Sequence, residues 1–445
     1  MLEILSRFVL HPLWDLRDSS VRMRTYRELL RSQWAPIEQL RATQARRLQE
    51  IGRYAAAHSP HYREQFKQAG VDPQQLTLES LQRLPLLTKT ELREHTEQML
   101  SDEFARDQLV VHKTGGSTGQ SVVVYLDKLW QQIRNGDELR ANHWAGWYPG
   151  TKVMAIWGNP PQPDSWRAKL RSALHSRMIF LDTMNISDVT LREFVEHWRR
   201  ERPRIVYGHA HSIFIVAEWL VQQGVTDLHP RGIVATSMML LPQERVVIER
   251  AFGCKVINRY GCEEVGLIAA ECEIHDGMHL NIEHLVIEVL REDGSPTAPG
   301  EEGVIVVTDL LNRAMPMIRY RVEDVGVLSE RHCTCGRQLP LLEKLVGRVA
   351  DYLKKADGSR VAGVSLVERT LTRITGLGQM QLVQTAIDRF EVRVVPTSSF
   401  DQSTVSAVEQ ELHEVFGANV QVSVEKVERI AQERSGKYRF SICKI

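Results

Sequence analysis

A glycine-rich loop is the part of the sequence whose residue types point most directly to chemistry. Residues 114–119 read TGGSTG and lie between two short β-branched, apolar runs at 108–111 and 122–126. Glycine lets a backbone approach a ligand closely, and successive N–H groups in such a loop form a concavity that binds anions. We therefore predict a hairpin whose loop holds the phosphates of a nucleotide, with a plain polar turn as the alternative.

The same stretch does not fit the P-loop pattern. A P-loop needs the spacing G-x-x-x-x-G-K-[ST] and leads into a helix. The pattern needs a second glycine five residues after the first. Here the residues five positions after Gly115 and Gly116 are Gln120 and Ser121, and the residues that follow predict a strand. Any phosphate site in this loop must belong to another class of nucleotide-binding protein.

Two adjacent carboxylates follow another strand signal. Residues 256–264 read VINRYGCEE, so a buried run ends in Tyr260, a glycine, Glu263 and Glu264. Carboxylates at the end of a strand can hold Mg²⁺ together with phosphate oxygens. A solvated acidic turn is the alternative interpretation.

Four cysteine and histidine residues have the types needed for a tetrahedral zinc site. Cys272 and His279 flank a short polar turn, and Cys333 and Cys335 form a C-x-C pair downstream. Three thiolates and one imidazole suit structural Zn²⁺, since four protein ligands leave no position open for water. We prefer His279 to His275 because the glycine turn before it can bring it back toward Cys272. Buried apolar cysteines are the alternative.

Length and composition limit the classes of protein to consider. The chain has 445 residues, enough for two or three domains, and its formal net charge of zero argues against nucleic acid as a main partner. Six cysteines in so long a chain do not form a disulfide framework and fit a reducing, cytoplasmic compartment. No apolar run approaches the roughly 20 residues that span a bilayer, so we expect no transmembrane segment.

The first residues form an unusual apolar stretch. Residues 1–14 are interrupted by Glu3, Arg7 and His11 and lack the layout of a signal peptide. A helix docked on the body of the protein is the first interpretation. A helix that lies on a membrane surface or on a partner is the alternative.

The order of strand and helix patterns predicts an α/β fold. Residues 1–100 are mostly helical, and residues 128–260 alternate strands with helices, which implies a parallel sheet covered on both faces. Residues 282–310 alternate with period two, as antiparallel strands do. A new α+β pattern begins near residue 347. We predict a large domain over 1–346 and a small, mobile C-terminal domain over 347–445.

With these segments in order, the chain resembles the adenylate-forming (acyl-CoA synthetase-like) superfamily. It is similar in particular to the phenylacetate–CoA ligase-like branch, which includes homologues from capsular-polysaccharide clusters. The resemblance covers nearly the whole chain. Five segments carry it: 114–119 (TGGSTG), 260–264 (YGCEE), 319–324 (RYRVED), 347–351 (GRVAD) and 435–437 (SGK).

The resemblance implies how ATP is held. Tyr260 would pack beside the adenine, Asp324 would accept hydrogen bonds from the ribose hydroxyls, and Arg348 would also reach the nucleotide. The segment that includes Arg348 would be the hinge on which the small domain rotates between two half-reactions. The residues implied to bind the β- and γ-phosphates are Thr114, Gly115, Gly116, Ser117, Thr118 and Gly119.

It also implies the catalytic groups. Glu264 would hold Mg²⁺, and Lys437 would bridge the substrate carboxylate and the α-phosphate. A carboxylate that attacks a phosphate brings two anions together, so a cation, loop N–H groups and a lysine are what the step needs. The acyl pocket should lie between residues 207–211 (YGHAH) and 236–239 (TSMM), where aromatic and methionine side chains favour an apolar or aromatic acid.

Several positions depart from the pattern of the family. Gln120 replaces a lysine, Glu263 stands where Thr or Ser is usual, and Glu323 replaces a glycine. Ala350 takes the place of the hinge acid. The change to Glu263 adds a negative charge near a polyphosphate, and the change to Ala350 bears on the domain rotation.

Three functions follow from this sequence. The first is an ATP-dependent ligase that forms an acyl-adenylate from a small carboxylic acid and then a CoA thioester. The second is an adenylating transferase whose acceptor is an amine or hydroxyl, and the third is a catalytically degenerate nucleotide-binding homologue. The cofactors implied are ATP, Mg²⁺, CoA and structural Zn²⁺; a homodimer is compatible with the sequence.

Overall fold

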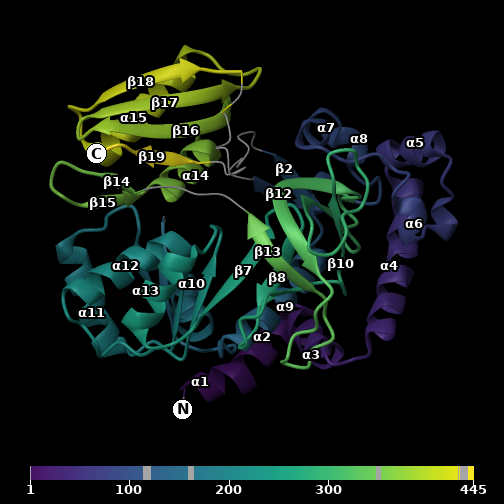
Figure 1. Ribbon diagram of the computed structural model, residues 1–445, viewed down its shortest axis with the longest axis horizontal. Coiled ribbons are helices and arrows are strands. Elements are labelled where there is room, and N and C mark those ends of the chain that lie inside the picture. The colour runs from purple at the N-terminus through teal and green to yellow at the C-terminus, as the bar shows by residue number, and fades with distance from the viewer. Residues whose placement is uncertain (1, 114–121, 159–164, 347–351, 429, 431–438) are drawn as a thin grey trace.

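A mixed sheet forms the centre of the molecule (Figure 1). The computed structural model describes residues 2–113, 122–158, 165–346, 352–428, 430 and 439–445. Within them, an 11-stranded sheet has the order β10-β11-β12-β13-β9-β8-β7-β6-β5-β3-β4, and a separate four-stranded sheet lies near the C-terminus. The predicted α/β fold class is confirmed. The domain boundary predicted at 346/347 falls beside the undescribed residues 347–351 and stays a prediction.

The N-terminal part is helical, as expected. The long helix α4 ends at His58, and Pro60 opens α5. Thr88 caps α7 through a capping box, since its Oγ1 accepts the N–H of Glu91 at 3.2 Å and Glu91 Oε2 accepts the N–H of Thr88 at 2.7 Å. Across the described residues, no helix has both the length and the apolarity to cross a bilayer. The elements are α1 Leu2–Leu5, η1 Ser6–Leu10, α2 His11–Arg17, α3 Arg22–Ser32, α4 Ile37–His58, α5 Pro60–Ala69, η2 Pro73–Gln75, α6 Leu78–Leu81, α7 Lys89–Glu94, α8 Thr96–Met99 and η3 Arg106–Gln108.

A two-stranded hairpin flanks the predicted phosphate loop. β1 (Val110–Lys113) and β2 (Val123–Leu126) pair antiparallel, which confirms the hairpin. Asp127 then starts α9 (Lys128–Trp144), because its Oδ1 accepts the N–H of Trp130 at 2.7 Å. β1 therefore leads into the predicted loop, and β2 and α9 lead away from it.

Five strands form the parallel half of the large sheet, in the order β7-β6-β5-β3-β4. Most of their side chains are buried on both faces, as a parallel sheet between helices requires. Figure 1 shows α11, α12 and α13 beside these strands. The elements are β3 Val153–Trp157, α10 Trp166–Arg171, η4 Ser172–Ser176, β4 Met178–Asp182, α11 Asp188–Glu201, β5 Ile205–His209, α12 Ala210–Gln222, β6 Gly232–Thr236, α13 Pro242–Phe252 and β7 Val256–Cys262.

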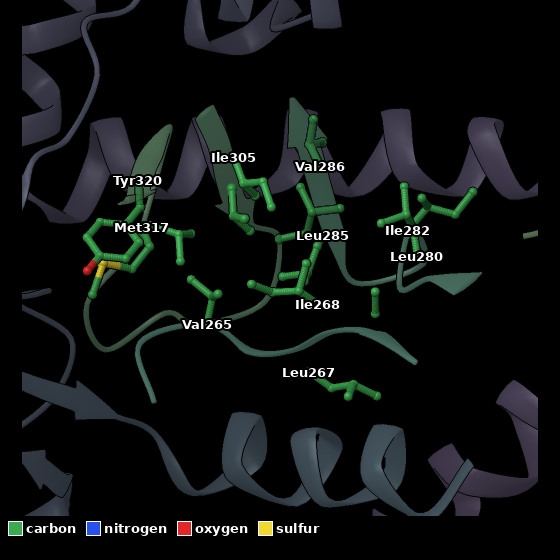
Figure 2. Close-up of a cluster of buried hydrophobic side chains, with 14 of the residues drawn as sticks. Val265, Leu267, Ile268, Leu280, Ile282, Leu285, Val286, Ile305, Met317 and Tyr320 are labelled. Carbon is green, nitrogen blue, oxygen red and sulfur yellow. The ribbon is translucent and has the colours of Figure 1, made fainter. Parts of the chain in front are cut away.

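The other half of the sheet is antiparallel and encloses its own core. Figure 2 shows side chains from β8, β10 and β11 and from the segment before β12 meeting in this core, among them Ile268, Val286, Ile305 and Met317. Burial of such side chains contributes about 1.5–3 kcal/mol each to folding. The strands are β8 Gly266–Glu271, β9 Met278–Leu280, β10 Leu285–Leu290, β11 Glu302–Asp309, β12 Tyr320–Ser329 and β13 Leu341–Val346.

The C-terminal residues form a sheet with two helices, located at the top of Figure 1. Asp401 caps α15, since its Oδ1 accepts the N–H groups of Ser403 at 2.8 Å and Thr404 at 3.1 Å. The strand order is β18-β17-β16-β19. The elements are β14 Tyr352–Lys354, β15 Arg360–Ala362, α14 Gly363–Arg373, β16 Leu377–Ala386, β17 Arg389–Pro396, α15 Gln402–Phe416, β18 Gln421–Lys426 and β19 Ser441–Cys443.

Candidate functional site

Two buried hydrogen bonds join β12 to the end of β7 and to the turn that follows it, and three of the four side chains are predicted site residues. The Tyr260 hydroxyl donates to Asp324 Oδ2 at 3.0 Å, and the Tyr320 hydroxyl donates to Glu264 Oε1 at 2.9 Å. β7 and β12 stand four places apart in the strand order, which in a flat sheet would separate them by about 19 Å. The antiparallel half must therefore curl strongly. The curl brings Tyr260, Glu264 and Asp324 to one place.

Tyr320 was not among the predicted site residues. Burial keeps the pKa of its hydroxyl well above the usual range, so it remains a donor that orients the Glu264 carboxylate. The sequence signal that could have identified Tyr320 as a site residue is its position inside the 319–324 segment. Its neighbour Arg319 has a structural role, because its guanidinium pairs with Glu288 at 3.1 Å and donates to the carbonyl of Leu84 at 2.6 Å.

The extra carboxylate of Glu263 is engaged by two partners, one of them the cationic Arg134. His112 Nδ1 lies 2.8 Å from Glu263 Oε2, and the Arg134 guanidinium donates to the same oxygen at 3.2 Å. The hydrogen bond with His112, with the charge of Arg134, lowers the pKa of Glu263 to about 2. The negative charge that the family pattern lacks is thus compensated locally. His112 stands two residues before residue 114, so this pair also ties the start of the predicted phosphate loop to the YGCEE turn.

The remaining predicted nucleotide and catalytic residues lie outside the described part of the chain. The structure describes only the elements that flank them. β1 and β2 flank the predicted phosphate loop, β13 and β14 flank the predicted hinge, and Ile430 and β19 flank the segment with Lys437. The departures Gln120 and Ala350 also lie outside it. The residues concerned are Thr114, Gly115, Gly116, Ser117, Thr118, Gly119, Arg348 and Lys437.

Gly261 has no room for a side chain. An added Cβ would lie 2.4 Å from the carbonyl oxygen of Gly266 on β8. We expect Gly261→Ala to destabilise the protein by about 3 kcal/mol in chemical denaturation, because the backbone must move at the turn that carries Glu264. Gly358→Ala is the control: its φ is +83° but nothing lies within 4 Å, so only backbone strain of about 1–2 kcal/mol is expected. Equal losses for both variants would contradict this explanation.

Glu323 occupies a backbone conformation that favours glycine. Its φ is 72°, at the position where the family has a glycine, and its Oε2 lies 3.2 Å from Nζ of the buried Lys89. We expect Glu323→Gly to destabilise the protein by about 2 kcal/mol, since losing a carboxylate beside a buried ammonium outweighs the relieved strain. The double variant Lys89→Met/Glu323→Gly should recover most of that loss in thermal unfolding. If Glu323→Gly is more stable than the wild type, relief of the backbone strain at this position outweighs the loss of the carboxylate.

Aromatic rings cluster at the ends of β3 and β5, where the acyl pocket was predicted. The Trp157 and Tyr207 rings stack with centroids 5.3 Å apart, and His209 lies 3.9 Å from Trp157. Trp147 lies 5.3 Å from Tyr207. Burial lowers the pKa of His209 to about 4, so its imidazole is neutral near pH 7. His211 bonds through Nδ1 to Glu244.

The four predicted metal ligands converge. The donor atoms of Cys272, His279, Cys333 and Cys335 all lie within 4.8 Å of one another. Cys272 Sγ is 3.7 Å from Cys333 Sγ, and Cys335 Sγ is 3.3 Å from His279 Nε2. Zn–S bonds of about 2.3 Å in a tetrahedron place two sulfurs about 3.8 Å apart, so the geometry fits zinc.

A second layer of hydrogen bonds orients these ligands. His279 Nδ1 lies 3.2 Å from the carbonyl oxygen of Leu339, which leaves Nε2 for the metal. The N–H groups of Ile274 and Arg337 point at the sulfurs of Cys272 and Cys335, at 3.5 and 3.4 Å. The structure thus places His279 with the thiols, as predicted. That zinc binds stays a prediction.

Known proteins that are similar to this chain include CapK and the phenylacetate-coenzyme A ligases. Residues 353–444 match the CapK C-terminal domain. The chain is 23% identical to protein CapK of Staphylococcus aureus over 90% of this chain and 88% of the relative. It is 29% identical to phenylacetate-coenzyme A ligase of Thermus thermophilus, over 72% of each chain.

Solved structures share the fold. The open conformation of 2-hydroxyisobutyryl-CoA ligase, in complex with 2-HIB-AMP and CoA, aligns with a TM-score of 0.58 at 23% identity, over 92% of both chains. The chain therefore shares the fold of the acyl-CoA ligases of the adenylate-forming superfamily, which its motifs indicated. By sequence, the chain is a homologue of CapK and of the phenylacetate–CoA ligases.

Proposed function

We propose that this protein activates a small carboxylic acid with ATP as an acyl-adenylate and then transfers the acyl group to CoA. One observation carries the proposal: Tyr260, Glu264 and Asp324, from segments distant in sequence, meet beside the turn to which His112 ties the glycine-rich hairpin. Separate polar segments that converge in this way can act on one nucleotide. Relatives that are phenylacetate-coenzyme A ligases support the reaction class.

Each described residue has a role in this proposal. Asp324, held by the Tyr260 hydroxyl, accepts hydrogen bonds from the ribose, and Tyr260 packs beside the base. Glu264, oriented by Tyr320, offers a carboxylate of the kind that Mg²⁺ shares with phosphate oxygens. Mg²⁺, when bound, would supply positive charge where two anions meet. The residues from Thr114 to Gly119 and Arg348 would complete the nucleotide site.

The aromatic cluster supports an apolar or aromatic acid. Trp147, Trp157 and Tyr207 present ring faces and edges rather than charges, and the neutral His209 adds none. Such surfaces favour apolar ligands with few polar groups. The acid is therefore proposed to carry an aromatic or aliphatic body on its carboxylate.

Two assays test the function. Pyrophosphate exchange into ATP is measured with a panel of aromatic, aliphatic and hydroxylated acids, and exchange with at least one of them is expected. CoA is then added, and a thioester is sought by mass spectrometry. Exchange without a thioester would favour an amine or hydroxyl acceptor, and absence of exchange with every acid would favour a degenerate homologue.

Lys437 should act in the first half-reaction. We expect Lys437→Ala to slow adenylation about ten- to a hundredfold, because the lysine neutralises charge between the carboxylate and the α-phosphate. Thioester formation from a chemically prepared acyl-adenylate should change much less. If Lys437→Ala retains both its fold and its full adenylation rate, the assignment is wrong.

A further inference from the structure

The first helical stretch docks on the protein with its polar side chains facing inward. α1, η1 and α2 follow one another without a break from Leu2 to Arg17. Ser6 and Asp15 are buried: Ser6 Oγ donates to the carbonyl of Leu174 at 2.8 Å, and Asp15 accepts from Arg22 at 2.9 Å. Glu3 accepts from Thr151 Oγ1 at 3.0 Å. An ordinary surface helix points such residues at water.

The apolar side chains of this stretch point outward. Phe8, Leu13 and Leu16 lie on the solvent side of the helical stretch, with exposed fractions of 65%, 57% and 77%. Of the 17 exposed large hydrophobic residues in the described chain, six fall within residues 4–16, so the exposure is concentrated rather than scattered. These six are Ile4, Leu5, Phe8, Val9, Leu13 and Leu16.

The neighbouring helix adds two more exposed apolar side chains. Trp166 and Leu170 on α10 are 69% and 51% exposed. They stand four residues apart and lead to Leu174, whose carbonyl oxygen accepts from Ser6 in the N-terminal stretch. Tryptophan is enriched where proteins meet the interface of a bilayer.

The charge around this surface is positive. Both acids within the stretch, Glu3 and Asp15, are engaged on the protein side. Arg17 and Arg171 are 61% and 56% exposed and share the single carboxylate of Asp18, at 2.7 and 3.5 Å. Two guanidinium groups against one carboxylate leave a positive surplus at the edge of the apolar surface.

We propose that residues 4–16, with Trp166 and Leu170, form an interfacial anchor that lies on an anionic lipid bilayer. These apolar side chains lie along a narrow helical stretch of 16 residues, about 24 Å long, which suits the plane of a bilayer. A two-fold dimer through this surface would instead bring the positive edges of both copies into one interface. A bilayer needs no matching surface, takes apolar side chains about 5–10 Å deep and attracts the arginines.

The position of the anchor leaves the candidate site accessible. Thr151 and Arg231, which lie against Glu3, come just before β3 and β6, at the amino ends of the parallel strands. The aromatic cluster lies at the carboxyl ends of β3 and β5. Figure 1 shows α1 at the lower edge of the molecule and the C-terminal sheet at the opposite end. The anchor does not depend on the proposed reaction.

Co-sedimentation of the full chain with vesicles tests the anchor. The vesicles contain three parts phosphatidylcholine to one part phosphatidylglycerol, with pure phosphatidylcholine as the uncharged comparison. The wild type should bind the anionic vesicles, and Phe8→Gln/Leu13→Gln/Leu16→Gln should weaken binding at least tenfold. Leu78→Gln/Val189→Gln/Val246→Gln is the matched control, because these side chains are also exposed and helical. It should bind like the wild type.

The remaining outcomes decide the proposal. Arg17→Gln/Arg171→Gln should reduce binding to the anionic vesicles more than to the uncharged ones, and added salt should do the same. A wild type that ignores both vesicle types would overturn the anchor. So would a wild type that sediments as a dimer which the Phe8 triple variant converts to monomer. Circular dichroism confirms that each variant retains its fold.

Discussion

Glu264→Gln is expected to lower acid-dependent pyrophosphate exchange about 10²–10³-fold while leaving the fold intact. Glutamine keeps an oxygen that accepts the hydrogen bond from the Tyr320 hydroxyl, now 2.9 Å from Glu264 Oε1, but it loses the negative charge. A divalent cation shared with phosphate oxygens needs that charge, and loss of one preorganised electrostatic contact costs a factor of this size. Exchange is measured at saturating acid and a range of Mg²⁺ concentrations.

The adjacent residue supplies the control. Glu263→Gln removes a carboxylate that His112 and Arg134 already occupy, at 2.8 and 3.2 Å, so exchange should fall less than about fivefold. Raising the Mg²⁺ concentration should partly restore pyrophosphate exchange by Glu264→Gln and leave the exchange rate of Glu263→Gln unchanged. If both variants lose activity equally, the assignment of distinct roles to the two carboxylates fails.

Patterns that are local in the sequence predicted local structure well. The helical N-terminal part, the hairpin around residues 114–119 and the change from parallel to antiparallel strands all depend on residues a few positions apart. The Cys/His set was also predicted from its residue types, and its donor atoms do converge. That zinc binds to these four residues stays a prediction.

Contacts between distant segments could not be read from the sequence. Nothing near Glu263 indicates that Arg134, on a helix 129 residues earlier, approaches its carboxylate. The curl that brings β12 to β7 depends on the accumulated twist of several strands. The N-terminal stretch was expected to dock, and it does; that it docks by Ser6 and Asp15 rather than by its leucines depends on polar partners elsewhere in the fold.

Removal of zinc should destabilise the large sheet more than any substitution on its surface. The purified protein is expected to contain one zinc per chain by elemental analysis. Cys333→Ser, or prolonged chelation, should abolish zinc content and lower Tm by about 5–10 °C, since several kcal/mol of metal binding is lost. The reason is geometric: the ligands tie the turn before β9 to the segment before β13, and these strands pair directly, with His279 opposite Leu341.

Two other cysteines make this prediction specific. Cys254 and Cys443 lie outside the ligand set, so Cys254→Ser and Cys443→Ser should keep the zinc and nearly the full Tm. His279→Gln tests the imidazole separately, because glutamine keeps the size of the side chain but is a poor ligand for zinc. Protein that contains no zinc while all four ligands remain chemically reduced would refute the site. In that case the 3.7 Å approach of Cys272 to Cys333 would be no more than the packing of two buried thiols.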